Sequence, residues 1–421
     1  MPDAAANPTP PRRMLALCYG TGLLSMGLMD LLMFIVPLWA IWLGASATEV
    51  GMVAGARSVV PCILAIHGGV LMDRLGTRRI MAVSAIAIIV TAPLYPALPW
   101  IPALIVLQLV TGYATTIAWV GAQTVIAQVC RGDTGVLGHF NFACRIGTFL
   151  APIVMGLLWD FTNPWLTFLV ISGWAAALLG LVIMTPDTRP GAPSAPPAAD
   201  TRVAAGAPSA RTLGARLRAL APRRADYLAT FALFLIPAIA MSLGGGFLRN
   251  TTSAVQGSIY VVYLKEIGLT GTAIGALFAA IEGASALGSL LAGRVSRWIH
   301  PYTLMVATTG IAIFLINATP LLGDIFAFLF AAQFLRGIIQ GVNQPVLFGI
   351  QARAAGPHRQ GATVALRVTV NRAVSIIVPP IMGVIADSAG IEMSFYLLGG
   401  VFLVMTVGLG VAARLVRDTG P

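Results

Sequence analysis

Hydrophobic and polar positions alternate along this chain in long blocks, not at the short periods of a soluble fold. Apolar runs recur at a length of about 20 residues or more, which is the length at which a helix crosses the hydrocarbon core of a bilayer. Each run therefore predicts one membrane-spanning helix. The predicted spans cover residues 14–43, 47–72, 80–98, 101–129, 138–160, 164–185, 228–264, 269–293, 302–322, 326–350, 361–386 and 392–414.

The spans fall into two groups of six, so we expect two bundles joined by a linker, with a short tail at each end. In chain order, the tail, bundle, linker, bundle and tail are 1–13, 14–185, 186–225, 226–414 and 415–421. The linker is rich in Pro, Ala and Arg and lacks aromatic residues, a composition typical of flexible chain. The predicted fold class is an all-α integral membrane protein with twelve transmembrane helices in two pseudo-symmetric six-helix bundles.

The composition supports this fold and excludes several classes of function. The chain is 57% hydrophobic and only 10% charged, whereas about 25% of residues are charged in an average soluble domain. The four cysteines form no CxxC pair and the four histidines no HExxH motif, so we expect no metal site. No G-x4-G-K-[ST] phosphate loop occurs, so we expect no ATP hydrolysis, no cofactor and no enzyme.

The charges also indicate how the chain crosses the membrane. A net charge of +11 can indicate nucleic-acid binding, but here the arginines lie in alternate short gaps, as in the cytoplasmic loops of membrane proteins. The other gaps carry mainly acids: Glu49, Asp160, Lys265, Glu266, Asp324, Asp387 and Glu392. We therefore expect a multi-pass protein of the cell inner membrane, with both termini in the cytoplasm and no nucleic-acid partner.

The two halves of the sequence repeat each other. The pattern R-x6-P-x2-M-G-x3-D begins at Arg145 and recurs 227 residues later from Arg372. Earlier glycines recur after 224 or 225 residues: Gly51 as Gly275, Gly69 as Gly293 and Gly112 as Gly337. Two such halves can enclose a central cavity and, by rocking, expose it to either side of the membrane in turn.

Residues 69–79 read GVLMDRLGTRR. This segment resembles the loop between helices 2 and 3 of the major facilitator superfamily, G-x3-D-R/K-x-G-x-R/K-R/K. The matching residues are Gly69, Asp73, Arg74, Gly76, Arg78 and Arg79. An ordinary arginine-bearing loop would explain the charges but not the glycines and the acid at this spacing. The resemblance implies a transporter in which these residues form a conformational latch and do not bind substrate.

Residues 138–156 are similar to the fifth-helix motif of antiporters, G-x8-G-x3-G-P-x2-G-G, although Ala151 and Met155 replace two of its glycines. This resemblance points to the branch of proton-coupled drug and metabolite antiporters, and so to efflux. Small residues and a proline make a pliable helix interface. We therefore assign gating or hinge roles to this segment and its repeat: Arg145, Gly147, Pro152, Gly156, Arg372, Pro379 and Gly383.

Ionisable residues inside a span are unfavourable in lipid and usually face a cavity or one another. Asp30 lies near the middle of the first span, where apolar surroundings favour the neutral acid. It is the first candidate for proton coupling, or for a contact with a cationic substrate, and the alternative is a fixed ion pair with Arg57 or Arg145. Glu282 is the second candidate, and its alternative is a structural pair with Arg249 or Arg336.

Polar side chains within the spans are candidates for binding substrate. Arg57, Arg249 and Arg336 have no basic counterpart in the repeat, and an arginine fork matches a carboxylate or phosphate. Helix 7 is weakened by three glycines at 244–246, and we interpret its polar residues as cavity lining, the alternative being a water-exposed stretch. Helices 4 and 10 add polar residues that line the cavity or pack between helices. The further substrate candidates are Trp119, Gln123, Asn250, Gln256, Gln340 and Asn343.

Together these patterns predict a secondary active transporter that moves a small organic molecule by alternating access. We expect protons to be the coupling ion, the bilayer to be the only other partner, and the protein to act as a monomer. Proton-coupled efflux is the first hypothesis. Proton-driven uptake of an organic anion is the alternative, because arginines outnumber acids within the spans. A transporter-like membrane sensor is the alternative outside transport.

Overall fold

In the computed structural model, residues 11–130, 134–185 and 236–418 are described, and they are almost entirely helical. The expected linker 186–225, most of the N-terminal tail, the start of the seventh predicted span and residues 419–421 of the C-terminal tail lie outside these residues. The first half contains α1 (Arg12–Trp42), α2 (Ala47–Leu75), α3 (Thr77–Thr91), α4 (Leu94–Ala97), α5 (Ile101–Cys130), α6 (Thr134–Phe161) and α7 (Pro164–Met184). The second half contains α10 (Pro237–Gln256), α11 (Ile259–Glu266), α12 (Gly271–Val295), α13 (Pro301–Asn317), the 3-10 helix η2 (Thr319–Leu322), α14 (Phe326–Ala389) and α15 (Ile391–Asp418).

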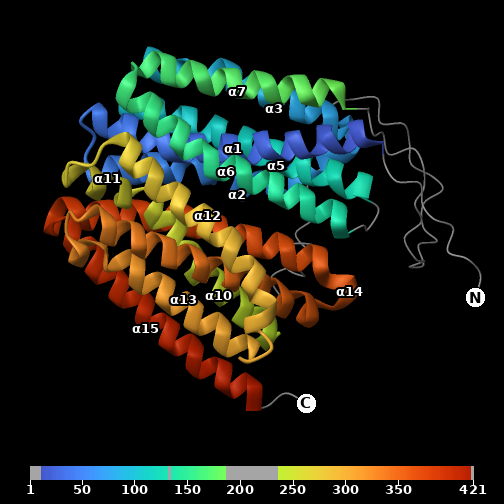
Figure 1. The fold of residues 1–421 in the computed structure, drawn as a ribbon, viewed down its shortest axis with the longest axis vertical. Coiled ribbons are helices and arrows are strands. Elements are labelled where there is room, and N and C mark those ends of the chain that lie inside the picture. Colours follow the sequence, from blue (N-terminus) through green and yellow to red (C-terminus); the bar gives the residue numbers. More distant parts are fainter. Residues whose placement is uncertain (1–10, 131–133, 186–235, 419–421) are drawn as a thin grey trace, which may run out of the picture.

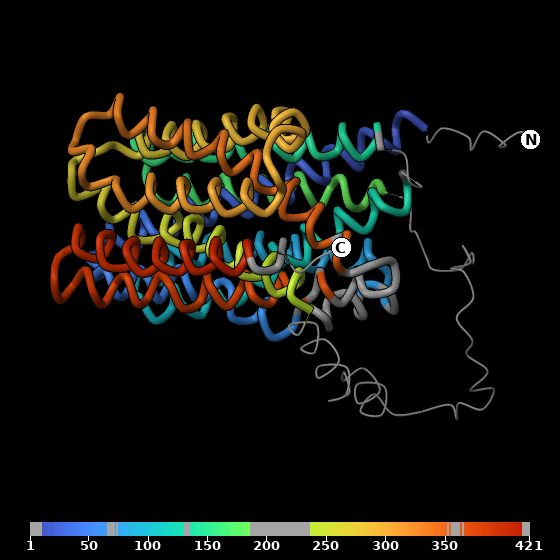
Figure 2. The backbone as a smooth tube through the Cα atoms, turned by 90° about the horizontal axis from the view of Figure 1, so that it is seen from below, coloured from blue at the N-terminus to red at the C-terminus, as the bar shows by residue number. Residues whose placement is uncertain are grey.

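The two halves form two helical bundles that lie against each other (Figure 1). Seen from below, the helices of both bundles run in the same general direction, and α1 begins at the end of the molecule where α15 finishes (Figure 2). Ten segments of the described chain are long and apolar enough to cross a membrane. The shorter α13 and the more polar α10 occupy the places of the ninth and seventh predicted spans. The predicted all-α, two-bundle membrane fold is therefore confirmed.

Large apolar side chains lie both inside and outside these bundles. The interior holds fully buried aromatic residues such as Phe34, Tyr95 and Phe168, and Tyr95 stacks on Phe168 with ring centroids 5.1 Å apart. The outer faces expose Leu290 and Val404, at 77% and 73% of their surface. Apolar side chains facing outward along whole helices are what a lipid environment requires.

Helix α14 differs from the prediction, because helical residues continue through the connection between the tenth and the eleventh predicted spans. Its 64 residues would extend about 95 Å if the helix were straight. Asp324 and Glu392, which flank its two ends, both act electrostatically on Tyr263. The helix therefore reverses direction between its two membrane-crossing segments, Phe326–Gln351 and Leu366–Ala389.

The seventh predicted span is broken, but not at the expected place. The glycines at 244–246 lie inside α10, where helical structure continues. The break falls at Gly257 and Ser258, and Ser258 leaves the helical region with φ −145° and ψ −102°. The backbone of Gly245 packs against Met305, whose sulfur would lie 2.7 Å from an added Cβ. Gly245 therefore allows close helix packing, and none of the three glycines breaks the helix.

The bundles join through two equivalent helix pairs, α6 with α12 and α14 with α2. In the first pair, an added Cβ on Gly156 would meet the Gly271 carbonyl, and one on Gly275 would meet the Pro152 carbonyl. In the second pair, Gly383 approaches the Ala47 carbonyl in the same way, and Gly51 approaches that of Pro379. Small residues thus allow backbone contact across both interfaces.

An aspartate closes each of these pairs at one end of the molecule. Asp160, near the end of α6, accepts hydrogen bonds from the backbone N–H groups of Gly271 and Thr272, at 2.7 and 2.6 Å. Asp387, near the end of α14, accepts them from Ala47 and Thr48, at 3.0 and 2.9 Å. Each carboxylate therefore caps the first turn of a helix in the opposite bundle. We call this end of the molecule, defined by Asp160, Asp387 and the first turns of α2 and α12, the bridged end.

Candidate functional site

A polar cavity of about 350 Å³ lies between the two bundles. Helices α1, α2 and α6 of the first half and α10, α12 and α14 of the second half contribute its walls. This volume is within the range of sites for small organic molecules. A cavity walled by both halves changes shape whenever the halves move relative to each other, so its contents are coupled to that motion.

Six ionisable side chains line this cavity, which we call the central cavity: Asp30, Arg57, Arg145, Arg249, Glu282 and Arg372. Four of them are arginines and two are acids. With every group ionised, the walls carry an excess of two positive charges. Such an excess in a site bordered by lipid-embedded helices attracts anions, because little water is available to screen it.

One ion pair crosses the cavity from bundle to bundle. The Arg145 Nη1 of α6 lies 2.8 Å from the Glu282 Oε2 of α12, and the two side chains are only 32% and 29% exposed. Gln344 of α14 accepts a hydrogen bond from Arg145 at 3.3 Å and another from Arg249 at 3.4 Å. Breaking such a half-buried pair leaves an uncompensated charge, so its state bears directly on whether α6 and α12 stay together.

Asp30 lies in α1, and its carboxylate faces this cluster. It interacts electrostatically with Glu282, Arg57 and Arg145. No arginine among the described residues lies within 4.0 Å of it, since Arg145 to Glu282 is the one ion pair found there. Asp30 is thus held near arginines without a fixed partner. A carboxylate in this situation can bind or release a proton without breaking a close ion pair.

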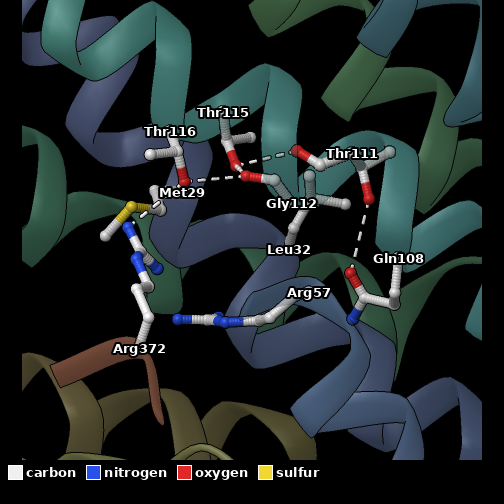
Figure 3. A pocket seen from close by; sticks show the side chains of 9 residues that line it. All are labelled: Met29, Leu32, Arg57, Gln108, Thr111, Gly112, Thr115, Thr116 and Arg372. Carbon is white, nitrogen blue, oxygen red and sulfur yellow. Dashed lines mark hydrogen bonds between the residues drawn. The ribbon is translucent and has the colours of Figure 1, made fainter. Parts of the chain in front are cut away.

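Arg57 and Arg372 reach the same place from opposite bundles. Arg57 comes from α2 and Arg372 from α14, and both line the central cavity as well as a small hollow of about 10 Å³ beside it (Figure 3). Arg372 donates a hydrogen bond to the Thr116 hydroxyl at 3.2 Å. The Arg57 side chain lies beside that of Arg372 (Figure 3).

The structure brings most of the sequence-predicted ionisable residues into this one cavity, together with two of the predicted amides. Asn250 donates to the Asn371 carbonyl at 2.7 Å and to the Ser375 hydroxyl at 3.1 Å. Gln340 donates to the Thr252 hydroxyl at 2.8 Å. Both amides also line the cavity, so they tie α10 to α14 and present polar edges to its interior.

Five other predicted substrate residues lie outside the cavity wall. Trp119 stacks on Phe140, with ring centroids 6.1 Å apart, and Gln123 is exposed on α5. Asn343 is buried and donates to Thr308 and Thr309 of α13. Arg336 is fully buried and donates to Gln256. Trp119, Asn343, Arg336 and Gln256 thus contact neighbouring side chains in this conformation, as the alternative of helix packing expects for Trp119 and Asn343. A substrate-binding role for these five residues stays a prediction.

Only part of the predicted latch falls within the described side chains. Gly76 adopts φ +90°, a conformation that favours glycine, and it separates α2 from α3 as a tight turn. Arg79 is exposed and Arg78 half-buried beyond that turn. The side chains of Asp73 and Arg74, and the surroundings of Gly69, lie outside the described part, so the latch role stays a prediction.

The predicted gating residues lie on the interfaces between helices. Gly147 packs against the Leu23 carbonyl of α1. Pro152 and Gly156 lie on the α6–α12 crossing, and Pro379 and Gly383 lie on the α14–α2 crossing. Each half thus supplies the same small-residue surface to the other.

Sequence reasoning missed Asn371 and Ser375, which line the cavity beside Arg372. They are four residues apart, so they lie on one face of the helix, and Val368 and Pro379 of that face also line the cavity. This spacing of polar residues in an apolar span was visible in the sequence and could have identified both.

Solved structures of transporters share this fold. The chain is similar to a variant of the nucleoside transporter NupG, with a TM-score of 0.74 and 11% identity, over 95% of this chain and 99% of that one. It is similar to a POT family transporter in complex with 5-aminolevulinic acid, with a TM-score of 0.74 and 13% identity, over 96% of each chain. A bacterial homologue of the human lysosomal transporter Spinster, in an inward-facing and unoccupied conformation, gives 0.72 and 14%, over 97% of this chain and 98% of that one.

In sequence, no curated protein matches this chain. The family model of the Major Facilitator Superfamily, however, matches residues 18–248 and 241–421, which together include both bundles and the segment between them. The family match and the similar structures are consistent with a cavity between two repeated halves. They indicate that the protein is a transporter rather than an enzyme. This chain therefore belongs to the major facilitator superfamily and is a membrane transporter.

Proposed function

We propose that the protein is a secondary active transporter that moves a small organic molecule across the inner membrane in exchange for protons. Both termini face the cytoplasm in this proposal. The observation that carries it is the charged cavity between the bundles, with the Arg145–Glu282 ion pair spanning it. Its walls come from both halves and include two acids, which is what coupling of substrate and proton to one movement requires.

Alternating access follows from the two interfaces. At the bridged end, the aspartate caps and the glycine contacts hold the bundles together. Rocking the bundles would separate these contacts and open the cavity to that side. Under the proposed topology the bridged end is extracytoplasmic, so the conformation described here is closed to the outside.

Protons enter the cycle through Glu282 and Asp30. A proton on Glu282 removes the charge that holds Arg145, so α6 and α12 lose their ion pair. Asp30 lies close enough to Arg145 and Arg57 to alter the charge balance of the same cluster. Protonation and substrate binding therefore act on one set of contacts between the bundles, and each changes the free energy of the other.

The proposal is tested in proteoliposomes loaded with a pH-sensitive dye. Organic anions and lipophilic cations are added as a panel, with and without an imposed pH gradient. We expect at least one compound to drive proton flux. Asp30→Asn and Glu282→Gln should each abolish the proton flux, while exchange of the same compound between the two sides continues.

The sign of the proton flux gives the direction of coupling. Proton movement opposite to the compound indicates efflux by exchange, and movement with it indicates proton-driven uptake. Glu49→Gln is the matched control, because Glu49 forms a capping box with Ser46 at the start of α2 and does not line the cavity. Transport that ignores the pH gradient in the unmodified protein would end the proposal of proton coupling.

A further inference from the structure

The repeat makes the two interfaces of the cavity directly comparable. In the first interface, α6 carries Arg145 and α12 carries its partner Glu282. In the second, α14 carries Arg372, the repeat counterpart of Arg145, and it faces α2. Gly112 packs on Arg57 of α2 as Gly337 packs on Ile281 of α12, so Arg57 is equivalent to Ile281 and the next residue, Ser58, to Glu282.

The second interface therefore lacks the acid that the first one has. Where the first has Glu282, the second has Ser58, which is fully buried. The adjacent Arg57 points into the cavity beside Arg372 (Figure 3). Arg57 and Arg372 thus approach each other from opposite bundles, and neither guanidinium has a carboxylate within 4.0 Å among the described residues.

Like charges held together in a site bordered by low-dielectric helices repel one another. An oxyanion placed between them would convert this repulsion into two attractions, and each guanidinium could offer it a pair of N–H donors. We propose that the acidic group of the transported molecule binds between Arg57 and Arg372 and replaces the carboxylate that the repeat lacks. This inference rests on the proposed transport function and names its substrate class: a small organic anion with a carboxylate or phosphate group.

The residues around Arg57 and Arg372 place the acidic group of the substrate on the side of the central cavity. The hydroxyls of Thr111, Thr115 and Thr116 donate to carbonyls within α5, at 2.8 Å each. Arg372 donates a hydrogen bond to the Thr116 hydroxyl in the wall of the small hollow, which orients its guanidinium. The hollow has room for about one water, so it is too small for a carboxylate or phosphate group. The anion therefore lies toward the central cavity, which holds the remainder of the molecule.

This arrangement gives Arg372 a role beyond the gating role expected from its repeat position. Because Arg57 belongs to one bundle and Arg372 to the other, an anion between them ties α2 to α14. The Arg145–Glu282 pair already ties α6 to α12. Substrate thus completes the second of two equivalent bridges across the cavity, one built in and one supplied by the anion.

The test measures binding to the purified protein in detergent, so that it does not depend on transport. Phosphate, succinate and benzoate are the anionic probes, choline is the cationic probe, and calorimetry and the thermal midpoint are the readouts. We expect at least one anion to bind and choline to leave the midpoint unchanged. Arg57→Gln and Arg372→Gln should each weaken the binding of that anion by about tenfold or more, since each substitution removes hydrogen bonds from a charged group. Arg57→Lys and Arg372→Lys should retain part of the affinity, because charge remains but the fork is lost.

Arg367→Gln is the matched control. Arg367 lies five residues before Arg372 on the same helix, but its guanidinium packs 4.1 Å above the Phe348 ring and does not line the cavity. Anion affinity equal to wild type in folded Arg57→Gln and Arg372→Gln proteins, or an equal loss in Arg367→Gln, would overturn the site. If the glutamine variants do not fold, the anion affinity of the lysine variants tests the site, and an affinity equal to wild type would overturn it. Anion binding without transport would refute the proposed function and leave this site standing, whereas proton-driven transport of cations alone would refute the site and leave the function standing.

Discussion

Removing the carboxylates of Asp160 and Asp387 should shift the protein toward conformations in which the bridged end is open. Each carboxylate accepts two backbone N–H groups from the first turn of a helix in the opposite bundle. The negative charge also lies at the positive end of that helix dipole. When the bundles separate at this end, all four hydrogen bonds are lost, so they stabilise only the closed conformation.

The size of the effect follows from these contacts. Loss of a helix cap costs about 0.5–2 kcal/mol, and a charge at a helix N-terminus contributes about 0.3–1 kcal/mol. Both aspartates are exposed, so the low half of the combined range applies, at about 1 kcal/mol for each alanine substitution. The double variant Asp160→Ala/Asp387→Ala should therefore raise the ratio of open to closed protein by about 30-fold, because 1.4 kcal/mol corresponds to tenfold. Asparagine keeps one acceptor oxygen and should produce about half of this change in free energy.

The populations can be measured by double electron–electron resonance, which gives the distance between spin labels at Phe161 and Leu321. Phe161 is the last residue of α6, and Leu321 lies in η2, just before α14 in the opposite bundle. The two side chains are 80% and 71% exposed, so labels there should not disturb packing. If opening is rare, it can be measured as the alkylation rate of Ser253→Cys, because Ser253 lines the cavity. With a membrane-impermeant reagent applied only on the side of the bridged end, this rate is proportional to the open fraction. Both measurements use a background without the native cysteines.

Glu49→Ala provides the control, because it removes a cap at the same end of α2 whose partner, Ser46, belongs to the same bundle. Its open-to-closed ratio should equal that of the unmodified protein. A double alanine variant with unchanged distances and unchanged alkylation would refute the reasoning. So would an equal shift in Glu49→Ala, since the effect would then be one of helix capping alone.

Two further predictions concern glycines. Gly383→Ala should move the same spin-label distances toward the open population, because the added Cβ would meet the Ala47 carbonyl on α2. Gly400→Ala, where nothing lies within 4 Å of the added Cβ, should not move them. Unchanged, closed distances in Gly383→Ala would contradict the tight α14–α2 contact. Gly76→Ala should lower the thermal midpoint, because φ +90° with ψ +132° costs a residue with a side chain about 1–3 kcal/mol. Gly138→Ala, at an open helical position, is its control, and equal midpoints in the two variants would show that the α2–α3 turn relaxes.

The sequence alone determined the membrane-spanning helices and the two-bundle fold. Hydropathy depends only on local composition, and lipid requires every buried backbone group to be paired within its own segment. The repeat from Arg145 to Asp160 and from Arg372 to Asp387 also predicted equivalent interfaces, because two similar sequences form similar helix surfaces. Gly76 was identifiable for the same local reason, since a turn with positive φ favours glycine whatever surrounds it.

The tertiary structure decided which polar residues meet. Glu282 pairs with Arg145 of the other bundle, and not with Arg249 or Arg336, the partners named in the alternative interpretation, because a partner is set by the rotation of each helix about its axis. The same rotation buries Arg336 and Asn343 away from the cavity and turns Asn371 toward it. The helix also breaks at Gly257 and Ser258 and not at the 244–246 glycines, one of which packs closely against Met305. Hydropathy along a span measures how polar it is, but only packing between spans fixes the direction in which each polar side chain points.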